Sequence, residues 1–130
     1  KKRVVITGLG VVAPNGVGIS AFLTSLKEGN SGIDFIPELK EFNFGCQIGG
    51  IPPLRDAHVF KYIPKKLFNR LNGPALIFGM VAAGEAWENA GFNLENNTGP
   101  DWETGSVFGQ PFGLLNGQGN ANTPRSDYAT

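Results

Sequence analysis

Val4–Ile6, within Arg3–Val12, is continuously apolar, whereas a strand with one solvated face would alternate apolar and polar residues. A second segment, Thr104–Gly109, has a short apolar centre at Ser106–Phe108. A strand that is covered by helices on both faces of its sheet needs apolar side chains on both faces. The pattern therefore predicts two strands in the middle of a sheet, Arg3–Val12 and Thr104–Gly109.

Turn-forming residues end the first predicted strand. Gly8 and Gly10 would let the backbone turn sharply, because glycine adopts conformations that other residues avoid. Pro14-Asn15-Gly16 is a second turn signal a few residues later.

A short helix with one apolar face follows this turn. Its apolar residues are spaced three, four and seven positions apart: Ile19, Phe22, Leu23 and Leu26. Gly29 stands where such a helix would stop. The next segment, Phe35–Pro53, is rich in glycine and proline, and we expect an irregular connection with one short strand around Phe44–Ile48.

A second helical region begins at Lys65–Leu71, which predicts one or two helical turns. Pro74 suits the first position of a longer helix, because its missing N–H has no partner there, and Gly91 is a suitable stop. Apolar residues recur every three or four positions between them: Ala75, Phe78, Ala82 and Ala86. Many residues of this helix are small, which predicts close packing against a neighbour.

The hydrophobic pattern is lost beyond Leu115. Asn116–Thr130 is polar and rich in glycine and asparagine, so we expect a loop or a disordered tail after a domain at residues 1–115. Two strands buried on both faces do not complete a sheet, because their edges need partners. The sequence therefore reads as one part of a larger body.

Composition excludes several classes of function. Eleven basic and eleven acidic residues cancel, which leaves no electrostatic argument for binding nucleic acid or an anionic membrane surface. The single cysteine, Cys46, favours a reducing compartment. No apolar run approaches the ~18 residues that span a bilayer, and Lys1–Ile6 lacks the features of a signal peptide. We expect a soluble, cytoplasmic protein.

Four stretches of the sequence carry a family resemblance. In order they are Arg3–Gly16, Gly29–Ile33, Tyr62–Lys66 leading into a helix that ends with Ala86–Phe92, and Thr104–Gly109. Together, over roughly residues 2–115, they resemble the amino-terminal portion of the β-ketoacyl-[acyl-carrier-protein] synthases, the ketosynthases of the thiolase superfamily.

This resemblance implies an α/β fold, the thiolase-like layered αβαβα arrangement, with only part of its first half present in this chain. It also implies a homodimer, or a heterodimer with another ketosynthase. We expect neither a metal ion nor a cofactor.

The activity that the resemblance implies is the decarboxylative Claisen condensation of fatty-acid or polyketide synthesis. A cysteine thiolate takes an acyl chain from acyl carrier protein, and the carbanion left when malonyl-carrier protein loses carbon dioxide attacks that acyl thioester. Two histidines and a helix N-terminus stabilise the developing charges. In the family these residues lie beyond the matched region, so we expect no catalytic residue and no condensing activity in this chain alone.

One residue, Phe112, matches a position that lines the acyl pocket in the family. Gln110–Leu115 would follow the second predicted strand near the dimer interface, and a bulky Phe112 would restrict or reshape the acyl channel. The proline within this segment departs from the family pattern. An alternative is therefore a non-catalytic, chain-length-determining partner subunit, which a residue other than cysteine at the downstream nucleophile position would identify.

Another alternative is a nucleotide-binding module. Gly8, Gly10 and Ala13 fit the glycine spacing of the dinucleotide fingerprint. That motif requires a helix to begin within it, whereas Pro14-Asn15-Gly16 delays the helix until about Ile19. A turn at the end of a strand is the favoured interpretation.

The remaining reactive or charged residues favour structural roles. We expect Cys46 to be a bystander thiol and His58 to be structural, since neither matches a catalytic residue of the family. Trp87 and Trp102 suit packing. The basic residues Lys61, Lys65, Lys66 and Arg70 favour a solvated surface, and docking of an acidic carrier protein is the alternative for them.

Overall fold

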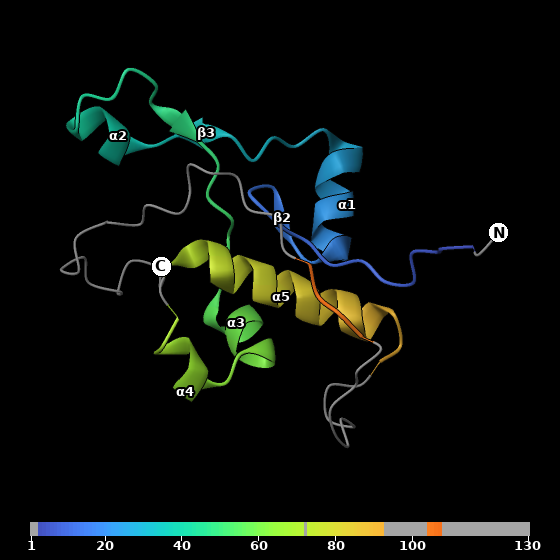
Figure 1. The fold of residues 1–130 in the computed structure, drawn as a ribbon. Helices are drawn as coiled ribbons and strands as arrows, with labels where there is room; N and C mark the ends of the chain where they lie inside the picture. The colour runs from blue at the N-terminus through green and yellow to red at the C-terminus, as the bar shows by residue number, and fades with distance from the viewer. Residues whose placement is uncertain (1–2, 72, 93–103, 108–130) are drawn as a thin grey trace.

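A computed structural model describes residues 3–71, 73–92 and 104–107 (Figure 1). Its helices are α1 (Ile19–Glu28), α2 (Pro37–Glu41), α3 (Asp56–Tyr62), α4 (Lys65–Phe68) and α5 (Pro74–Asn89). Its strands are β1 (Val12–Ala13), β2 (Gly16–Val17), β3 (Asp34–Phe35) and β4 (Ile48–Gly49).

The long helix α5 is the centre of the described fold. Figure 1 shows the β1–β2 hairpin and α1 on one side of α5, and α3 and α4 on the other. Pro74 occupies its first turn, and Gly91, just past its end, has a left-handed φ of 85°. Both boundaries predicted from the sequence are confirmed.

The four strands form two short antiparallel hairpins. In the first, Val12 pairs with Val17 across a turn at Pro14 and Asn15, as the turn signal indicated. In the second, Phe35 pairs with Ile48, and α2 lies in the intervening loop. The strand expected around Phe44–Ile48 therefore begins only at its last residue.

The core lies between α3 and α5. Three of its residues are buried: Val59, Ile63 and Val81. The two helices cross closely at Gly84, because a β-carbon there would come within 2.6 Å of the Tyr62 ring. This agrees with the prediction that the small residues of α5 permit close packing.

Helix α1 is confirmed, but its apolar face has little cover. It runs to Glu28 and ends on Gly29 with φ of 70°. Leu23 and Leu26 remain 46% and 56% exposed. Since this face carries the amphipathic pattern of a packed helix, the described residues do not contain the surface that would cover it.

The prediction of two strands buried on both faces is wrong for this structure. Val4, Val5 and Ile6 are not in a strand and are 95%, 69% and 83% exposed, and Val107 is fully exposed. A strand needs a neighbouring strand, and neither segment is part of the two hairpins that the described residues form. The helices and short strands agree with an α/β class, whereas the layered thiolase-like arrangement stays a prediction.

No helix in the part of the chain that the structure describes has both the length and the apolar character needed to cross a bilayer. The expected tail at 116–130, and the end of the second predicted strand, lie outside the described residues.

Candidate functional site

The segment Arg55–Arg70 concentrates positive charge that the chain as a whole lacks. It contains five of the eleven basic residues and one of the eleven acidic residues. The five basic side chains are all exposed, and we call them the basic corner: Arg55, Lys61, Lys65, Lys66 and Arg70. The neutral composition of the whole chain therefore conceals a local basic surface.

A buried isoleucine and a proline shape this basic corner. Helix α3 ends at Tyr62 because a residue before proline avoids the helical conformation, and Ile63 is extended with φ of −116°. The Pro64 carbonyl accepts hydrogen bonds from the amides of Leu67 (2.8 Å) and Phe68 (2.9 Å), which starts α4 at once. Ile63 is 0% exposed, so this bend is fixed to the core.

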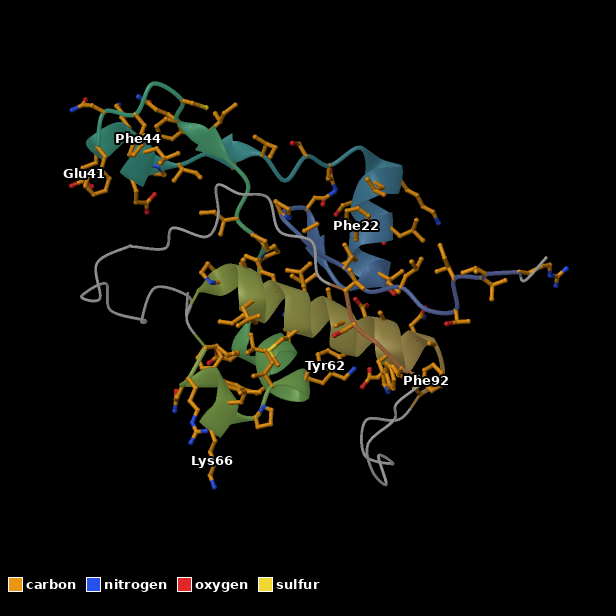
Figure 2. The ribbon with its side chains drawn as sticks, in the orientation of Figure 1. Phe22, Glu41, Phe44, Tyr62, Lys66 and Phe92 are labelled. Atoms are coloured by element: carbon orange, nitrogen blue, oxygen red, sulfur yellow. The ribbon has the colours of Figure 1, made fainter. Side chains whose placement is uncertain are left out.

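The lysines on either side of the bend stay in solvent. Figure 2 shows Lys66 pointing away from α5. The ammonium of Lys65 lies 5.3 Å from the centroid of the Phe60 ring, a cation–π contact that leaves its charge uncompensated.

One residue of the basic corner, Lys61, is neutralised by a carboxylate on α5. The Lys61 ammonium donates to Glu88 Oε2 at 2.6 Å and to the Tyr62 hydroxyl at 2.8 Å, and that hydroxyl donates to Glu88 Oε2 at 2.9 Å. Among the residues that the structure describes, this is the one ion pair. Four positive charges of the basic corner thus have no carboxylate partner in the described residues.

These contacts shift the pKa values of all three groups. The hydrogen bond to Glu88, and then that to Tyr62, raises the pKa of Lys61. Hydrogen bonds from Lys61 and Tyr62 lower the pKa of Glu88. Partial burial of the Tyr62 ring raises the pKa of its hydroxyl. At neutral pH the cluster therefore holds an ammonium, a carboxylate and a protonated phenol.

A half-open hollow of about 210 Å³ lies beside the basic corner, between the first hairpin, α3 and α5. Its lining includes Val17, His58, Lys61 and Glu85. His58 Nδ1 accepts a hydrogen bond from the Arg55 amide at 3.2 Å, at the start of α3. This is a structural contact of the kind that the sequence favoured for His58.

Gly8 and Gly10 lie against α5 and do not make a sharp turn. A β-carbon at Gly8 would fall 2.8 Å from the Ala90 β-carbon, and one at Gly10 would fall 2.7 Å from the Ala86 nitrogen. Neither glycine is among those with positive φ. The expected turn is therefore wrong at these two positions, where the missing side chain permits close approach.

The amide groups that a nucleotide phosphate would need are already bound. Glu85 Oε1 accepts from the amide of Ile19, the first residue of α1, at 2.7 Å, and Glu85 Oε2 accepts from the amide of Val11 at 2.9 Å. A dinucleotide motif keeps the helix N-terminus open for pyrophosphate. A carboxylate in that place would repel a phosphate, which argues against the nucleotide-binding alternative.

The other singled-out residues add no reactive group to the site. Cys46 is exposed, and its sulfur lies 3.7 Å from the Ile48 carbonyl oxygen, whereas a nucleophile needs a base or cation beside it. Trp87 packs against Phe92 with ring centroids 4.7 Å apart. Trp102 and Phe112 lie outside the described residues, so the expected acyl-pocket contact stays a prediction.

Sequence reasoning missed the two carboxylates of α5, Glu85 and Glu88. They are the charged residues of an otherwise apolar and small-residue helix. A carboxylate on such a helix needs a hydrogen-bonding or cationic partner. The two glutamates were therefore a signal that the sequence already contained.

Comparison with known proteins decides the family. The model of the β-ketoacyl synthase N-terminal domain matches residues 1–128. The chain belongs to the β-ketoacyl synthase family. The resemblance inferred from the four sequence stretches is thereby confirmed.

Several relatives within the β-ketoacyl synthase family are similar to this chain. The 3-oxoacyl-[acyl-carrier-protein] synthase 1 of Haemophilus influenzae is 34% identical over 117 residues, 90% of this chain and 27% of the relative. The enzyme of the same name from Escherichia coli K12 is 34% identical over 113 residues, 85% of this chain and 27% of the relative.

A polyketide protein is similar as well. The tetracenomycin polyketide synthase ketoacyl synthase beta subunit of Streptomyces glaucescens is 36% identical over 95 residues, 71% of this chain and 22% of the relative. The chain thus spans about a quarter of the length of these relatives.

Proposed function

We propose that this chain serves in a ketosynthase of fatty-acid or polyketide synthesis, and that its basic corner receives the acidic acyl carrier protein. The match to the β-ketoacyl synthase N-terminal domain supports the reaction class. The observation that carries the docking role is the cluster of exposed cations that lack carboxylate partners in the described part of the chain.

The geometry suits capture of an acidic protein more than a purely solvated surface. Lys65 and Lys66 begin α4 immediately after a bend that is fixed by the buried Ile63, so their backbone positions are set. Opposite charges on two proteins speed their encounter and suppress wrong partners. A basic surface on a chain of zero net charge supplies this attraction locally.

Catalysis belongs to residues outside this segment in our proposal. The family nucleophile and its two histidines would lie further along a longer polypeptide, and residues 1–130 alone would not condense acyl and malonyl thioesters. The proposal includes a dimer with a second ketosynthase subunit. A cytoplasmic location is supported by the single, unpaired cysteine.

The test of docking is charge reversal at Lys65 and Lys66 in the native polypeptide. The variant Lys65→Glu/Lys66→Glu should raise KM for acyl carrier protein about tenfold, because two attractive contacts become repulsive. It should leave kcat nearly unchanged, and it should leave turnover of an acyl-pantetheine substrate, which carries no protein, unchanged.

A matched control carries the same change in net charge at a different surface. Lys27 on α1 and Lys40 on α2 are exposed and lie outside the basic corner, so Lys27→Glu/Lys40→Glu should keep KM within about twofold. Equal effects of the two double variants on KM, or no effect of either, would refute docking at the basic corner.

The second candidate function is the partner subunit that shapes the acyl channel of an active synthase. The similarity to a ketoacyl synthase beta subunit of a polyketide synthase favours it. The intact mass and sequence of the native polypeptide separate the two candidates. Cysteine at the nucleophile position means an enzyme, and glutamine or another residue there means a partner subunit.

A further inference from the structure

The side chain of Glu85 joins three parts of the described chain. It projects from the C-terminal half of α5, and its two oxygens accept hydrogen bonds from the amides of Val11 at 2.9 Å and Ile19 at 2.7 Å. One amide precedes the β1–β2 hairpin and the other opens α1. The carboxylate therefore closes both ends of the hairpin onto α5.

Helix α1 has no N-terminal cap of its own. Its N-cap residue is Gly18, with φ of 87° and no side chain to accept a hydrogen bond, and its first turn contains no acidic residue. A helix N-terminus presents unpaired amides and a partial positive charge. Glu85 supplies the missing acceptor and the missing negative charge from a different helix.

Few other contacts hold α1 to the rest of the fold. None of its residues is buried, and it packs mainly on β2. A further tie, the hydrogen bond of Ser25 to the Asn15 carbonyl at 2.6 Å, connects α1 to the hairpin and not to α5. The attachment of α1 to the core thus runs through the hairpin and Glu85.

We infer that the ionised carboxylate of Glu85 is a latch that holds the β1–β2 hairpin and α1 on α5. Loss of its charge loosens this segment, whose remaining contacts with the core and α5 include Val12 and Gly10, while α3 and α5 stay packed on each other. A neutral carboxyl or amide group keeps one good acceptor oxygen, so one of the two amides loses its partner and the charge on the helix end is lost.

Peptide-resolved hydrogen exchange of the native polypeptide tests the latch. In Glu85→Gln, peptides covering residues 11–28 should exchange about tenfold faster than in the wild type, because a charge-assisted hydrogen bond is lost. Peptides covering 56–68 and 74–89 should keep their protection.

Glu88→Gln is the matched control, since it removes the same charge from the same helix three residues away. It should leave the exchange rate of residues 11–28 unchanged. The inference would be overturned if Glu85→Gln left the exchange rate of residues 11–28 unaltered, or if Glu88→Gln raised that rate equally. It would also be overturned if Glu85→Gln accelerated exchange equally across residues 56–89, or if residues 11–28 had no protection in the wild type. Glu85→Asp, which keeps the charge on a shorter side chain, should restore part of the protection.

Discussion

Gly10 lies so close to Ala82 that a β-carbon on residue 10 would overlap the Ala82 carbonyl oxygen. The same holds one turn further along α5, where Gly8 meets Ala86 and Ala90. Between these contacts the Leu9 amide donates to Asn89 Oδ1 at 3.1 Å. The start of the chain therefore follows α5 in the opposite direction, backbone against helix.

Gly10→Ala should be strongly destabilising for this reason. The new methyl group would press on helix backbone, which cannot rotate away as a side chain can, and overpacking of this kind costs about 1–3 kcal/mol or more. Gly45→Ala is the control, because nothing lies within 4 Å of a β-carbon there. Urea unfolding of the native polypeptide measures both variants, and equal midpoints would contradict the backbone contact.

Ile63→Ala should destabilise the fold through its core. The side chain is 0% exposed, and truncating a fully buried isoleucine to alanine costs about 2–5 kcal/mol. Ile51→Ala provides a comparison, since Ile51 is 65% exposed and should change the free energy of unfolding by less than about 1 kcal/mol. Denaturant titration of the two variants decides between a core and a surface position for Ile63.

The Lys61–Glu88 pair should make a small, pH-dependent contribution to stability. The pKa of Glu88 is lowered by folding, so its contribution is present above its unfolded pKa and is lost as the pH falls through the folded pKa. The pKa of Lys61 is raised, so its contribution is complete below its unfolded value of about 10.4 and is lost only as the pH rises through the folded pKa.

Both pH dependences leave the Lys61–Glu88 ion pair fully formed at neutral pH. Glu88→Gln should therefore lower the urea midpoint slightly at neutral pH and remove part of its acid dependence. High salt should shrink the difference, because both side chains are exposed. A difference between wild type and variant that is largest at acid pH would contradict this assignment.

Residues 1–130 expressed alone should self-associate. Val4, Val5 and Ile6 expose apolar side chains and a backbone segment without strand partners in the described residues, which is a template for pairing with another chain. Sedimentation should show an average mass that rises with protein concentration, and the double variant Val4→Lys/Ile6→Lys should reduce this rise. A monodisperse monomer that melts cooperatively would exclude this behaviour.

Local signals in the sequence predicted α1, α4 and α5, but not α2 or α3. Apolar spacing and a terminal glycine set α1, and Pro74 and Gly91 set α5, because these effects act within a few residues. The family was likewise readable from short stretches with a fixed order.

Features that depend on distant residues could not be predicted in this way. Val4–Ile6 has the composition of a buried strand, yet a strand forms only beside a partner. The roles of Gly8 and Gly10 depend on where α5 lies, some seventy positions later in the chain. Four residues of the basic corner were grouped from the sequence, whereas the shape of their surface follows from the bend at Ile63 and Pro64.

That bend has an energetic consequence for any protein that meets it. A recognition loop that is loose in solution must be ordered on binding, and the lost freedom subtracts from the affinity. Here the buried Ile63 and the adjacent Pro64 already fix the main chain that carries Lys65 and Lys66. Only the flexible ends of the lysine side chains remain to be ordered, so little of the affinity for a partner is lost to ordering of this surface.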